Sequence, residues 1–207
     1  MRSILRRLFV LLMFFIFTLL WIKSYNGCMQ HLGLLTIILL IMGLGFVITK
    51  WPGGIHMTFS QHAATNRSSK VFYSSLFMLT LPILMLFFSA WLVPEKDLSN
   101  VFLWFAGVSV VFQIVCTWVP EDGGIRTVIH RILTSISGIA MLPLVAVIAM
   151  APNLSAFVRT MALIVLFLMI ALIGIALRNQ KEYKRALLLQ VGYYAAFFLV
   201  ILTATYC

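Results

Sequence analysis

The chain has 207 residues, of which 63% are hydrophobic and only 10% are charged. Soluble domains carry about 25% charged residues, so this composition excludes a soluble globular protein and predicts a protein embedded in lipid. The net charge of +10 does not indicate nucleic-acid binding, because the Lys and Arg residues lie between apolar runs, where they act as topology signals. The cysteines show neither a C-x-x-C pair nor a zinc-binding spacing.

Apolar runs follow one another along the chain, and a membrane-spanning helix needs roughly 20 apolar residues. Seven such runs cover residues 8–22, 32–49, 71–93, 101–119, 132–151, 161–177 and 186–206. We therefore predict an all-α, polytopic transmembrane helix bundle with seven spans, in a single integral membrane domain over residues 1–207. Residues 1–30 are expected to form a retained signal-anchor helix with its outer loop, and residues 31–207 a six-helix core.

The distribution of Lys and Arg predicts the orientation of this bundle. With the N-terminus in the cytoplasm, the outer segments hold three cations and the inner segments hold the other twelve, as the positive-inside rule expects. The inner residues Arg178, Lys181, Lys184 and Arg185 are expected to attract anionic lipid headgroups. Retinal proteins and G-protein-coupled receptors have their N-terminus outside the cell, so the predicted orientation excludes both classes. The seventh run also has no lysine that could form a retinal Schiff base.

Ionisable residues are densest between the fourth and fifth runs, in residues 118–131. Residues 51–70 carry a similar order of Trp, Pro, Gly, Gly, Ile and His. Both loops lie on the predicted cytoplasmic side, so a chemical site is expected where they meet. The candidate catalytic residues are Ser60, His62, Glu121, Asp122, His130 and Arg131.

The two loops and the runs around them suggest a parallel two-helix repeat. Matching Trp, Gly, His and Leu-Pro positions are separated by 61 to 70 residues, so the repeat requires insertions. The alternative is that loops at membrane surfaces reuse Trp, Pro and Gly without any duplication.

Three kinds of chemistry compete for these polar residues. A histidine could act as general base with Ser60 as nucleophile on a lipid ester. Imidazole and carboxylate could instead bind a divalent metal, for which the candidates are His56, His62, Asp122 and His130. The chain has neither H-E-x-x-H nor G-x-S-x-G, so the histidines can equally cap helices and bond to loop backbone. A further structural hypothesis is that Glu121 or Asp122 pairs with Arg131 or Arg67 and thereby joins the two loops.

The order of these motifs also resembles a known family. Ser60-x-His62-Ala63 is followed by an aromatic helix start, then by W-x-P-E-D-G-G at residues 118–124 and by I-H-R at residues 129–131. This resembles the bacterial and archaeal membrane family called domain of unknown function 998, itself similar to the eukaryotic damage-regulated autophagy modulator (DRAM) proteins, over roughly residues 30–150. The resemblance implies a bundle of about six helices with no established activity, in the plasma (inner) membrane of a prokaryote. It carries over His62, Asp122, His130 and Ser60.

The leading interpretation is a multi-pass membrane protein with a cytoplasmic-face cluster of His, Asp and Glu, associated with lipid, without a cofactor and without nucleic acid. A membrane-embedded lipid hydrolase using His62, His130 and Asp122, with or without metal, is the first alternative. A transporter of small solutes or lipids is the second, although the runs contain no deep Asp, Glu, Lys, Arg or His.

Overall fold

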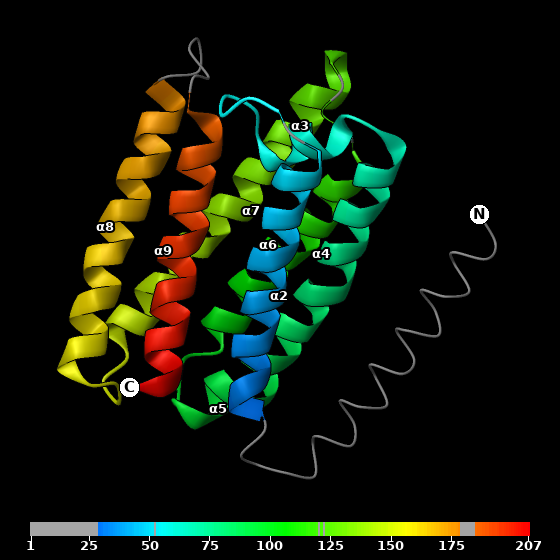
Figure 1. Ribbon diagram of the computed structural model, residues 1–207. Helices are drawn as coiled ribbons and strands as arrows, with labels where there is room; N and C mark the ends of the chain where they lie inside the picture. The colour runs from blue at the N-terminus through cyan, green and yellow to red at the C-terminus, as the bar shows by residue number, and fades with distance from the viewer. Residues whose placement is uncertain (1–28, 52, 120, 122, 179–184) are drawn as a thin grey trace.

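The computed structural model describes residues 29–51, 53–119, 121, 123–178 and 185–207 (Figure 1). Every regular element in these ranges is helical, which confirms the predicted all-α class. The elements are α2 (Met29–Lys50), α3 (Phe59–Ala64), α4 (Arg67–Phe87), the π-helical turn η1 (Phe88–Leu92), α5 (Val93–Glu95), α6 (Val101–Trp118), α7 (Gly124–Met150), α8 (Ala156–Arg178) and α9 (Ala186–Tyr206). The predicted leading helix, residues 8–22, lies outside the described residues.

Within those ranges, six helices are long and apolar enough to cross a membrane. They are α2, α6, α7, α8, α9 and the continuous span Arg67–Glu95, which joins α4, η1 and α5. Each coincides with one of the last six predicted runs. The chain is therefore an integral membrane protein by the length and composition of its helices.

The six long helices pack around one another in chain order. Each long helix contacts the next one along the chain, in the order α2, α4, α6, α7, α8 and α9. The last helix, α9, also contacts α2 and α7. Figure 1 shows α3 at one end of this bundle and α5 at the other. We name these the α3 end and the α5 end. The loops that contain Glu121 and His62 both lie at the α3 end, as the sequence predicted.

Several helices begin earlier than the apolar runs suggested. α4 begins at Arg67 rather than at residue 71, because Asn66 caps it and exchanges hydrogen bonds with Ser69. α7 begins at Gly124 rather than at residue 132. His130 therefore lies in the second turn of α7 and not at the head of the helix, where the apolar runs place it. A search for apolar runs does not include a first helical turn that contains polar residues, so it places the start of the helix too late.

Close packing of α2 against α4 depends on Gly43. A Cβ atom at this position would lie 2.5 Å from Leu76 Cδ2, whereas one at Gly45, two residues later, would meet nothing within 4 Å. We expect Gly43→Leu to lower the free energy of unfolding by about 1–3 kcal/mol through overpacking, as measured by SDS titration in mixed micelles. Gly45→Leu adds the same side chain on the exposed side of α2 and is the control. Equal stability of the two variants would contradict this packing.

Candidate functional site at the α3 end

The short helix α3 is positioned by its caps and by α9. Thr58 Oγ1 accepts from the Gln61 backbone N–H, and the Gln61 side chain accepts from the Thr58 N–H, which completes a capping box. The Phe59 N–H donates to Gln190 Oε1 on α9 at 3.0 Å. Six residues are too few for a stable isolated helix, so these bonds and the packing of Phe59 fix the place of α3 over the bundle.

The carboxylate of Glu121 is the centre of the site. Its Oε2 accepts from Thr58 Oγ1 at 2.9 Å and from Ser60 Oγ at 2.8 Å. Its Oε1 accepts from Gln61 Nε2 at 3.2 Å and from Arg131 Nε at 3.1 Å. These donors come from α3 with its N-cap and from α7, so one carboxylate connects the two loops.

Burial makes these bonds necessary. The Glu121 side chain is only 3% exposed, whereas that of Arg131 is 48% exposed. An ionised carboxylate offers about four acceptor positions, and four side-chain donors of the protein itself engage Glu121. A buried charge is tolerated when it is paired and hydrogen-bonded in this way.

His130 lies beside Glu121 but is held by backbone. Its Nδ1–H donates to the Val119 carbonyl at 2.7 Å, because a carbonyl can only accept. Its Nε2 is then 4.0 Å from Glu121 Oε2 and 3.4 Å from Cys116 Sγ. His130 is 4% exposed, so the ring is a buried group between the carboxylate and the thiol.

His62 repeats this arrangement in α3. Its Nδ1–H donates to the Trp51 carbonyl at 3.1 Å. Both histidines thus bind the carbonyl eleven residues upstream, and in the sequence both acceptors are followed by proline. The two histidines and the two carbonyls are each 68 residues apart, which lies within the 61 to 70 residues that separate the matching positions of the suggested repeat. The difference is that His62, fully buried, has no partner for Nε2.

The structure brings together four of the six candidate catalytic residues. Ser60, Glu121, His130 and Arg131 lie in one cluster. His62 is engaged with Trp51 and shares no described hydrogen bond with that cluster. Asp122 lies outside the described residues.

The metal hypothesis receives no geometric support from the described part of the chain. There, no three His, Cys, Asp or Glu side chains are grouped closely enough to hold a metal ion. His56 is exposed, with its ring against Gly54, and His62 is fully buried, with its ring close to Gly53.

The expected ion pair between Glu121 and Arg131 is confirmed. It lies within the second loop and α7, however, so it does not join the two loops. That connection is made by Thr58, Ser60 and Gln61, of which only Ser60 is a candidate from the sequence. The pattern Thr-x-x-Gln at residues 58–61 is a recognisable capping-box signal that would have placed a helix start here.

We compared the chain with protein-family models, with curated proteins and with solved structures, and none of them matches. The assignment of a function therefore depends on the geometry of the site itself.

Proposed function

We propose that the protein is a non-enzymatic, lipid-associated membrane protein whose α3 end faces the cytoplasm. Glu121 stabilises that end by holding α3 against the start of α7. The observation that carries the proposal is that donors of the protein itself engage Glu121 at four acceptor positions. A carboxylate used in this way supports the fold and has no free lone pair for a substrate or a metal ion.

The distribution of charge supports this orientation and an association with anionic lipid. At the α5 end the cations Lys96 and Arg159 are balanced by Glu95 and Asp97. At the α3 end only one acidic residue, Glu121, is among those described. The described cations at that end are Lys50, Arg67, Lys70, Arg126, Arg131, Arg178 and Arg185. Such an excess is typical of the cytoplasmic side. The plasma (inner) membrane of a prokaryote is part of the proposal through the family resemblance alone.

Selectivity for anionic lipid tests this part of the proposal. Each cation near the surface contributes about 1 kcal/mol to the attraction, so removing one weakens lipid association about five-fold at its site. We expect Arg178→Gln with Arg185→Gln to reduce the preference for spin-labelled phosphatidylglycerol over phosphatidylcholine, measured by electron paramagnetic resonance in reconstituted vesicles. Glu95→Gln with Lys96→Gln removes one acidic residue and one cation at the α5 end, leaves its net charge unchanged and should change little. An unchanged preference in the first pair would contradict lipid association at the α3 end.

The contact between Ser60 and Glu121 favours a second candidate, a lipid hydrolase. A carboxylate 2.8 Å from a hydroxyl can act as its base, and His130 lies near the same carboxylate. His62 and Asp122 are the other candidates for such a reaction. A fluorophosphonate probe decides between the two functions: labelling that disappears in Ser60→Ala supports the hydrolase. Absence of labelling supports the structural role, because Ser60 is 8% exposed and its hydroxyl is already engaged.

The resemblance to the family called domain of unknown function 998 is part of the proposal for residues 30–150. It is supported by the order of the motifs and by helices long enough to span a membrane. The transporter alternative would need a wide polar passage. The interior cavity between α2, α4, α6, α7 and α9 measures only 50 Å³, and no charged side chain is among its lining residues.

A further inference from the structure

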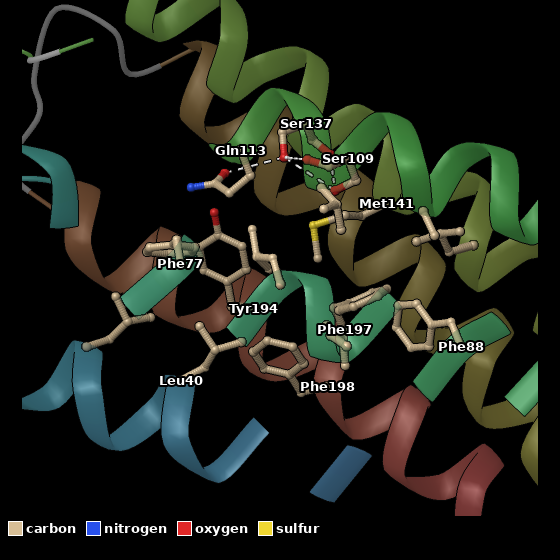
Figure 2. A pocket seen from close by; sticks show the side chains of 16 residues that line it. Leu40, Phe77, Phe88, Ser109, Gln113, Ser137, Met141, Tyr194, Phe197 and Phe198 are labelled. Atoms are coloured by element: carbon tan, nitrogen blue, oxygen red, sulfur yellow. Dashed lines mark hydrogen bonds between the residues drawn. The ribbon is translucent and has the colours of Figure 1, made fainter. Parts of the chain in front are cut away.

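One buried ring nitrogen at the α3 end has no hydrogen-bond partner. Among the described residues, His62 Nε2 is the only buried side-chain nitrogen or oxygen in this condition. It belongs to α3 and not to the interior cavity, whose lining residues come from the long helices (Figure 2). Buried polar groups in folded proteins are nearly always hydrogen-bonded, so this nitrogen needs an explanation.

The hydrogen bond on the other side of the ring defines what this nitrogen can do. Because a carbonyl can only accept, Nδ1 carries the proton that His62 donates to Trp51. In the neutral ring, Nε2 then has a lone pair and no proton. Histidines that bind metal ions almost always donate their other ring N–H to a carbonyl, a carboxylate or water in this way. The ring therefore has the protonation and the fixed orientation of a metal ligand.

The sulfur of Met57 lies next to this ring. The two side chains meet over Gly53, where a Cβ atom would lie 2.5 Å from Met57 Sδ and 2.8 Å from His62 Cε1, the ring carbon bonded to Nε2. Gly53 is exposed and Met57 is half-buried, whereas His62 is fully buried. A thioether and an imidazole are therefore neighbours at a place where the loop reaches solvent.

This pair of donors selects the kind of metal ion. Thioether sulfur binds soft ions such as Cu(I), and imidazole suits copper as well. Glu121, the one described carboxylate at this end, is already engaged by four donors. Two neutral ligands leave the charge of the ion uncompensated, and the α3 end already carries an excess of cations. A monovalent ion is therefore favoured over Zn²⁺ or Cu²⁺.

We propose that Met57 Sδ and His62 Nε2 form a binding site for a Cu(I) ion at the α3 end. The copper remains Cu(I) throughout, so binding requires no oxidant or reductant. The site is separate from the Glu121 cluster, and its existence does not depend on the function proposed for that cluster.

The test titrates Cu(I), under anaerobic and reducing conditions, into the purified full chain in nanodiscs, in competition with the chromophoric Cu(I) chelator bicinchoninate. Cys28→Ser and Cys207→Ser are introduced first, because thiolates also bind Cu(I). We expect one equivalent of tightly bound Cu(I) per chain. X-ray absorption at the copper edge should show one nitrogen and one sulfur neighbour.

Removal of the sulfur donor should weaken this binding strongly. Met57→Leu keeps the volume of the side chain and leaves the hydrogen bond of His62 in place. Even the outer-shell partners of metal ligands change affinity roughly 10- to 100-fold when mutated, so loss of a ligand should weaken Cu(I) binding by about 100-fold or more. His62→Asn removes the nitrogen donor and should have the same effect.

Two controls separate this site from adventitious binding. Met150→Leu removes an exposed thioether at the α5 end, and His56→Ala removes an exposed imidazole in the same loop. Both should keep the affinity for Cu(I). Absence of a stoichiometric site, or equal affinity of Met57→Leu and Met150→Leu, would overturn the proposal, as would loss of binding in His56→Ala alone. If His62→Asn fails to fold, Met57→Leu still decides between these outcomes.

Discussion

Replacing Glu121 by leucine is expected to destabilise the protein strongly. The substitution removes the carboxylate that accepts from Thr58, Ser60, Gln61 and Arg131, and the Thr58 and Ser60 hydroxyls keep only their 2.8 Å contact with each other. Because Arg131 is 48% exposed, its guanidinium stays hydrated after the change, so most of the cost comes from the side-chain donors left without an acceptor, at about 1–3 kcal/mol each. We therefore expect the free energy of unfolding to fall by about 4 kcal/mol, as measured by SDS titration in mixed micelles.

Two further variants separate the role of the charge from the role of the side chain. Glu121→Gln keeps one acceptor oxygen and the shape of the group, so we expect a smaller loss of about 1–3 kcal/mol. Glu95→Leu removes an exposed carboxylate at the α5 end and should change stability by no more than about 0.5 kcal/mol. If Glu121→Leu were as stable as Glu95→Leu, the four hydrogen bonds would have no stabilising role.

The second large effect is expected at His62. This ring is fully buried, and it binds the carbonyl of Trp51, just after α2. His62→Ala should cost about 3 kcal/mol, because it leaves a cavity and an unsatisfied carbonyl. Since His62 Nε2 has no partner, only the donor at Nδ1 has to be preserved. His62→Asn places an amide N–H near that position and should recover about 1 kcal/mol.

The control for this series is His56→Ala, in the same loop. His56 is exposed, and its removal should change the free energy of unfolding by about 0.5 kcal/mol or less. We expect thermal unfolding in a mild detergent to rank the stability of the His62 and His56 variants in the same order as SDS titration. The hydrogen bond to Trp51 would be unimportant if His62→Asn were no more stable than His62→Leu, which fills the space without a donor.

Apolar composition alone predicts the membrane-spanning helices, since long runs of Leu, Ile, Val and Phe have no other stable environment than lipid. It does not predict where those helices begin. Arg67 and Gly124 start α4 and α7 outside the apolar runs, because N-terminal turns are stabilised by caps and solvent and not by burial. The π-helical turn at Phe88–Leu92 likewise has no composition signal.

The candidate site was predictable as a meeting of two loops but not in its contacts. Glu121, His130 and Ser60 stand out as rare polar residues in an apolar chain. Gln190 is also a polar residue in an apolar run, but nothing in the sequence indicates that it accepts a hydrogen bond from the backbone of α3. The hydrogen bond between Gln113 and Ser137 joins α6 to α7, as polar side chains inside apolar helices commonly do.

The central claim is that Glu121 holds α3 against α7, and a double-mutant cycle between Ser60 and Glu121 tests it most directly. We expect Ser60→Ala to lower the free energy of unfolding by about 1 kcal/mol in the original protein. In the Glu121→Leu background the cost should be clearly smaller, because the Ser60 hydroxyl has already lost this acceptor and keeps only its contact with Thr58 Oγ1 at 2.8 Å. The two losses would then be clearly non-additive. Losses that simply add, within about 0.3 kcal/mol, would show that Ser60 and Glu121 act independently and would contradict the connection between the two loops.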